Sequence, residues 1–128
     1  MFNQRKTIEA LNYFASRRDG KTISKLVALK LIWLADRYHA RQFGTVPSHT
    51  KDYLDGLSSK GFKFESDCLI PIGSYTYEST RDPNMKVFSE TDIESLALIF
   101  DKFGKMKPEE LVEYTHKLPE WKRYESEI

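Results

Sequence analysis

The feature that most constrains the fold is a run from Leu26 to Ala35 that is apolar except for Lys30. Ser24 is a favourable N-cap before this run and Gly44 a favourable C-terminal cap after it, so the pattern predicts a helix over residues 24–43. A helix that is apolar on every side has no face for water. We therefore expect this helix to be the buried centre of the fold.

Four further helices are predicted from apolar spacing and from capping residues. A turn at Asp19-Gly20 ends the first, and Ser48 is placed to cap the second. Ser89 with Asp92 resembles a capping box at the start of the third, and Pro108 opens the fourth. These helices cover residues 4–17, 48–57, 89–104 and 108 to about 117.

The middle of the chain has a different pattern, typical of short strands. Four β-branched or aromatic runs are separated by turn-forming residues, over residues 61–65, 68–72, 75–78 and 85–88. Pro71 removes a backbone donor from the second run, which places that run at a sheet edge or a bulge. The predicted class is α+β: a mainly helical single domain over residues 1–128, with a buried central helix and a small antiparallel sheet.

Charge and cysteine content restrict the cellular setting. Twenty basic and nineteen acidic residues give a net charge of +1, so no global field draws the chain to nucleic acid or to a membrane. One cysteine, Cys68, cannot form an internal disulfide, and its apolar surroundings predict a buried structural thiol. No signal peptide or membrane-spanning run is present in this sequence, so we expect a cytoplasmic protein.

The usual signatures of catalysis and of cofactor binding are missing from the sequence. The three histidines, His39, His49 and His116, lack the spacing of helical metal ligands, and there is no Gly-x-Ser-x-Gly nucleophile elbow. The six glycines are scattered as turn and cap residues rather than gathered in a phosphate-binding loop. We predict no catalytic residue, no metal site and no cofactor, and a protein that acts by binding a macromolecule.

Asp36 is the unusual residue of the central helix. Helical geometry places it on the apolar side, where a carboxylate costs several kcal/mol unless it is paired or hydrogen-bonded. We expect a partner for it, such as an arginine, a lysine, a tyrosine hydroxyl or helix-end amides. Two interpretations stay open: a structural ion pair, or a site residue with His39, three positions further on, as its companion.

Three cations on the same helix form a second pattern. At roughly 100° per residue, Lys30, Arg37 and Arg41 share one narrow face. This basic stripe is either a solvated outer face or a contact for an acidic partner.

A winged-helix arrangement is an alternative, since three helices are followed by short strands. Its reading helix would be residues 48–57, with His49, Lys51, Asp52 and Asp55 pointing outward. Two carboxylates and no arginine make a poor surface for the DNA backbone. These residues argue against direct binding of nucleic acid. A winged-helix-like DNA-binding transcriptional regulator nevertheless stays the second hypothesis.

The string from Lys30 to His39, which includes Asp36 and Arg37, resembles the core motif of the Panacea or SocA-like antitoxin domain, a family also known from phage-associated proteins. The segment Gly44-Thr-Val-Pro47-Ser is similar to the family's Gly-Pro-Val-Pro-Ser. The family's ending resembles residues 110–121, which hold His116 and Trp121. A further Asp-x-Tyr-x-Ala stretch that relatives carry before Pro47 is missing here.

This resemblance implies an antitoxin that neutralises a cognate protein toxin by direct binding, in some relatives as an adaptor that delivers the toxin to an AAA+ protease. The motif residues would then serve the fold or the partner contact. Because interfaces favour Trp, Tyr and Arg, exposed aromatic residues are candidates for the contact with the toxin. The alternative is that the same side chains are buried and complete the hydrophobic core. These aromatic candidates are Tyr75, Tyr77, Trp121 and Tyr124.

Overall fold

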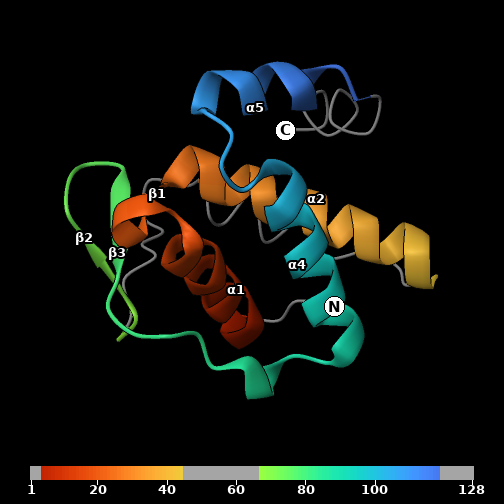
Figure 1. The fold of residues 1–128 in the computed structure, drawn as a ribbon, viewed down its shortest axis with the longest axis horizontal. Helices are drawn as coiled ribbons and strands as arrows, with labels where there is room; N and C mark the ends of the chain where they lie inside the picture. Colours follow the sequence, from red (N-terminus) through yellow and green to blue (C-terminus); the bar gives the residue numbers. More distant parts are fainter. Residues whose placement is uncertain (1–3, 45–66, 119–128) are drawn as a thin grey trace.

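The computed structural model describes residues 4–44 and 67–118 (Figure 1). Within these ranges the chain is mainly helical, and three short strands occur between the helices along the sequence. The predicted mainly helical α+β class is confirmed. The bounds are α1 Gln4–Arg17, β1 Thr22–Ser24, α2 Lys25–Phe43, β2 Leu69–Pro71, β3 Thr76–Ser79, α4 Glu90–Phe103 and α5 Pro108–His116. No helix in this described part is long and apolar enough to cross a membrane.

Helix α2 is the central helix, as predicted. The Ser24 hydroxyl accepts a hydrogen bond from the Val27 amide at 3.2 Å, and Gly44 ends the helix with a φ of 70°, which glycine adopts without strain. Seven consecutive residues, 30 to 36, are buried, so every side of the helix is covered over that stretch. Figure 1 shows α5 on one side of α2 and α1 with α4 on the other.

The sheet is three-stranded and antiparallel, in the order β1-β3-β2. Its inner face carries Ile23, Leu69 and Tyr77, all buried in the core against the helices. Pro71 ends the edge strand β2, as its missing amide predicted. The sequence did not reveal β1, because three residues directly before a helix are too few to show an alternating pattern.

The two C-terminal helices begin at the predicted caps. Ser89 and Asp92 form a reciprocal capping box, in which each side chain accepts a hydrogen bond from the other residue's amide. Pro108 is the first residue of α5, where its missing amide costs nothing. These local signals fix where α4 and α5 start, and therefore which side chains they turn toward α2.

One predicted strand is wrong, and two predicted elements lie outside the described residues. Residues 85–88 do not pair with the sheet: Met85–Val87 is a 3-10 turn, in which the Asn84 side chain accepts a hydrogen bond from the Lys86 amide at 3.1 Å. This local bond turns the chain, and Phe88 packs into the core from the turn. The helix over 48–57 and the strand over 61–65 fall in the undescribed part of the chain.

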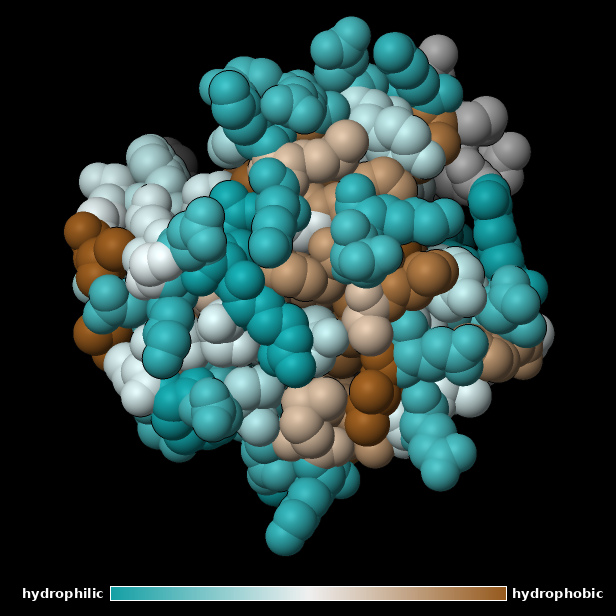
Figure 2. Space-filling view, in the orientation of Figure 1, coloured by the Kyte–Doolittle hydropathy of each residue, from teal (hydrophilic) through white to brown (hydrophobic). Residues whose placement is uncertain are grey.

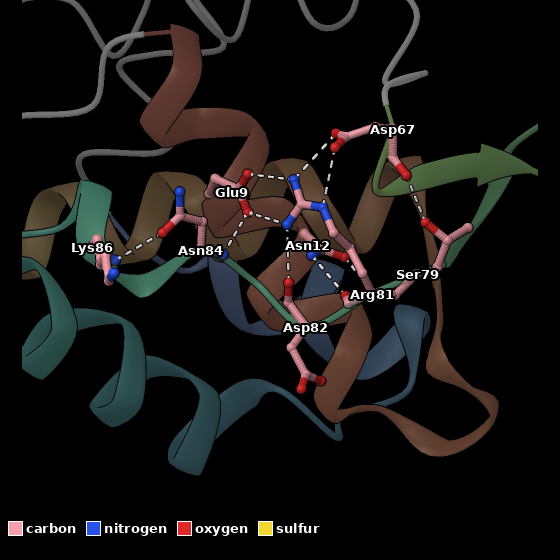
Figure 3. Close-up of polar contacts among 9 residues, drawn as sticks. Glu9, Asn12, Asp67, Ser79, Arg81, Asp82, Asn84 and Lys86 are labelled. Carbon is pink, nitrogen blue, oxygen red and sulfur yellow. Dashed lines mark hydrogen bonds and ion pairs between the residues drawn. The ribbon is translucent and has the colours of Figure 1, made fainter.

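Arg81, in the loop after β3, joins three segments that are far apart in the sequence (Figure 3). Its guanidinium binds both carboxylate oxygens of Glu9 on α1, at 3.2 and 2.8 Å, and both of Asp67, at 3.2 and 3.1 Å. Burial alone would raise the pKa of Glu9, but hydrogen bonds from Arg81 and the Asn84 amide outweigh it and hold that pKa below its usual range. The network fastens the sheet and its following loop to α1.

Removal of Arg81 should therefore be costly, because it leaves the nearly buried Glu9 carboxylate without its counterion. We expect Arg81→Met to lower the free energy of unfolding by about 2–4 kcal/mol, measured by urea denaturation at neutral pH. Asp67→Asn is the control, since the Asp67 side chain is 77% exposed and its ion pair with Arg81 should contribute much less to the free energy of unfolding. Equal losses in the two variants would contradict this account. Since the pKa of folded Glu9 is lowered, the Arg81→Met deficit should also shrink as pH falls below the ordinary value of 4.5.

Candidate partner-binding site

A groove lies between α2, α4 and α5, with a volume of about 260 Å³. The lining residues of α2 lie about one helical turn apart, and so do those of α4, so each of these two helices presents one face to the groove. Figure 2 shows hydrophobic residues in a band across the middle of the viewed face, where Figure 1 draws α4, with hydrophilic residues on both sides. The lining residues are Trp33, Leu34, Arg37, Tyr38 and Arg41 from α2, Leu98, Ile99, Lys102 and Phe103 from α4, Tyr114 from α5, and Leu118.

Buried apolar side chains form the base of the groove, and more exposed aromatic and basic side chains form its rim. Trp33, Leu34 and Ile99 are buried at its base. The rings of Phe103 and Tyr114 lie 4.9 Å apart at 41° and join α4 to α5. Tyr114 is 39% exposed, so this aromatic pair reaches the surface.

The charge of the lining has one sign. It carries Arg37, Arg41 and Lys102, and none of the described lining residues is acidic. The Arg37 guanidinium lies 5.5 Å from the centre of the Trp33 ring, and its buried Nε has no hydrogen-bond acceptor in the described part of the chain. Neither Arg37 nor Lys102 has a carboxylate of the described residues within ion-pair distance. The arrangement can accept an anionic group on an apolar base.

Asp36 lies next to Arg37 in sequence but points inward, as predicted, and is 3% exposed. For its Oδ2, the expected hydrogen-bond partner is not found among the described residues. Burial raises the pKa of Asp36 to about 6, although the Arg37 charge acts in the opposite direction. The carboxylate therefore destabilises the fold when it is ionised.

His39 is also buried, but its companion is on α4 rather than at Asp36. Its Nε2 lies 2.9 Å from the Thr91 hydroxyl and 3.6 Å from Asp92 Oδ1. The other oxygen of Asp92 accepts a hydrogen bond from Lys6 Nζ at 2.9 Å. Burial lowers the pKa of His39 although Asp92 acts to raise it, so a neutral ring is favoured. The cluster ties α1, α2 and α4 together. It does not include Asp36, so the open alternative of an Asp36–His39 site gains no support from these contacts.

Among the described residues, no three His, Cys, Asp or Glu side chains are grouped so that they could hold a metal ion. Cys68 is buried, as its apolar surroundings predicted.

Comparison with family models identifies one match, the Antitoxin SocA-like, Panacea domain, over residues 36–122. The chain belongs to the SocA-like Panacea family. Neither a curated protein nor a solved structure matches it. The match confirms the resemblance seen in the sequence motifs, and it covers all of the groove lining except Trp33 and Leu34.

The Panacea motif residues divide between the fold and the surface. Asp36 and His39 are buried, Arg37 is half-buried at the groove, and His116 is exposed on α5. Pro47 and Trp121 lie outside the described residues. Thr115, beside His116 in the Thr-His motif, is fully buried and bonds to α2.

The predicted basic stripe does not include Lys30, which is buried. Lys30 is only 2% exposed, and its Nζ donates a hydrogen bond to the Thr115 hydroxyl at 2.9 Å. Helical periodicity placed it with Arg37 and Arg41, but α5 packs over its end of α2 and encloses its long aliphatic stem. Arg41 is exposed as expected, at the rim of the groove.

The aromatic candidates for partner binding differ in their exposure. Tyr75 is 73% exposed between β2 and β3, whereas Tyr77 is 8% exposed and belongs to the core. Tyr124 lies outside the described residues. The sequence reading did not single out Lys102, Phe103 or Tyr114 as binding residues, because only the packing of α4 and α5 against α2 brings them together.

Replacing Asp36 tests its electrostatic cost. A folded-state pKa of about 6, against an ordinary value of 3.8, means that no cost exists below about pH 4 and that the full cost, roughly 3 kcal/mol, exists above about pH 6. We expect Asp36→Asn to be more stable than the wild type at pH 8 by up to this amount and equally stable near pH 4, measured by urea unfolding. Asp101→Asn, an exposed site on α4, should show no such pH-dependent gain. A destabilised Asp36→Asn protein at pH 8 would contradict the assignment.

Proposed function

We propose that this chain is the antitoxin of a bacterial or phage toxin–antitoxin pair and neutralises its toxin by direct binding. The observation that carries the proposal is the family match over residues 36–122, which spans the C-terminal part of α2 and the two C-terminal helices that build most of the groove. The function needs a binding surface and no chemistry of its own. We therefore propose a binding protein rather than an enzyme.

The composition of the groove supports this role. Protein interfaces concentrate their binding energy in a few Trp, Tyr and Arg side chains around an apolar centre. The groove presents these residue types together, in Trp33, Tyr38, Arg37 and Tyr114, at the meeting point of three helices. A rigid helical base reduces the entropy lost on binding. We propose that the pair acts in the cytoplasm, where a reduced Cys68 is expected.

Co-expression with the neighbouring open reading frame tests the proposal. We expect the neighbour to arrest growth alone and to be tolerated when this chain is present, with the two proteins co-purifying as a complex. A harmless neighbour that forms no complex would refute the proposal.

The same cells separate neutralisation by binding from delivery to a protease. If the chain is an adaptor, the toxin level should fall on co-expression in normal cells and recover in cells that lack the AAA+ protease. A toxin level that stays constant in both strains, with growth restored, indicates inhibition by binding alone.

A gel shift on the promoter of this chain's own gene tests the second hypothesis, a DNA-binding regulator. Binding to the promoter that is no tighter than binding to random DNA argues against that hypothesis.

A further inference from the structure

The groove between α2, α4 and α5 has features that restrict what can bind there, beyond the general role of an interface. Across the described chain it gathers three cations and no carboxylate, although the whole protein is almost electrically neutral. Local excess charge of this kind is complementary to an acidic surface. Arg37 and Lys102 contribute this charge without ion-pair partners among the described residues.

The apolar part of the groove restricts the partner further. Four aliphatic side chains line it together with four aromatic ones, so the bound group must bring apolar side chains as well as negative charge. A nucleic acid would need a longer row of cations to follow its phosphates and exposed aromatic faces to stack its bases. Here the Trp33 ring is buried at the base of the groove, which favours aliphatic anchors over bases.

The dimensions fit a short helical segment. From Trp33 to Arg41 the α2 face is about 12 Å long at 1.5 Å per residue, close to two helical turns. A volume of about 260 Å³ holds anchoring side chains but not a whole helix. A helix lying across the groove could therefore insert side chains from positions i and i+4 while its backbone stays outside.

We propose that the groove binds an acidic amphipathic helix of the toxin. Apolar side chains of that helix enter between α4 and α2, and its carboxylates pair with Arg37 and Lys102. This inference rests on the proposed antitoxin function, because it names the segment of the toxin that the antitoxin holds.

Charge reversal at the groove tests the inference in the complex of the full chain with its toxin. We expect Lys102→Glu to weaken the complex about tenfold or more, because it removes a pairing cation and adds repulsion. Lys86→Glu is the matched control, as Lys86 is also exposed but lies outside the groove, and it should change affinity less than about twofold. Arg37→Glu should act like Lys102→Glu, and far-UV circular dichroism with thermal melting confirms that each variant folds.

Leu98→Glu provides a second test of the apolar contact. Leu98 is half-buried in the groove lining, so a carboxylate there blocks insertion of an apolar anchor and repels acidic residues. If Lys102→Glu and Leu98→Glu both bind the toxin as the wild type does, the groove inference is wrong while the antitoxin function stands. If the wild type neutralises no neighbouring gene product, the function itself is wrong.

A synthetic probe tests the chemistry without the toxin. A fluorescein-labelled amphipathic helix of about four turns, with leucine on one face and glutamate on the other, should bind the wild type by fluorescence anisotropy. It should bind more weakly to Lys102→Glu and when NaCl is raised from about 50 to about 300 mM. A lysine version of the same helix should not bind. Tighter binding of the lysine helix or of a single-stranded oligonucleotide, or dimerisation of the chain lost in Lys102→Glu, would each overturn the inference.

Discussion

Water reaches so little of residues 30–36 and of His39 in α2 that each polar side chain there must find a partner on another element or carry the cost of having none. Lys30 bonds to Thr115 of α5, and His39 lies against Thr91 and Asp92 of α4. Each of these bonds joins α2 to a helix more than fifty residues away in sequence, so they specify which helix packs where as well as contributing energy. The burial of α2 is thus the constraint that orders the rest of the molecule.

The position of the groove is related to the lengths of the helices that cover α2. α2 has 19 residues, whereas α4 has 14 and α5 has 9, so neither α4 nor α5 alone spans its whole length. Figure 1 shows the C-terminal end of α2 extending beyond α4. Where the cover ends, apolar side chains from three helices meet the surface beside Arg37 and Arg41. The groove is therefore built from the margin of the core, on helices that the core holds in place.

Sequence reasoning succeeded where the signal was local. The caps at Ser24 and Ser89, the apolar run of α2 and the edge position of Pro71 each depend on residues close together in the chain, and each is confirmed. It failed where the outcome depends on distant packing. Nothing near Lys30 indicates that α5 covers it, and nothing near Asp36 indicates that its oxygen stays without a partner. For the same reason Lys102 and Tyr114 could be recognised as groove residues only after α4 and α5 were placed on α2.

The buried carboxylate of Asp36, whose Oδ2 accepts no hydrogen bond from the described residues, affects how long the folded protein survives. An electrostatic cost of roughly 3 kcal/mol at neutral pH corresponds to an unfolded population on the order of a hundredfold larger than that of a chain with a neutral residue at this position. Wherever a protease removes the unfolded form and refolding is fast, the rate of turnover follows that population. Under those conditions, the buried carboxylate shortens the lifetime of the folded protein.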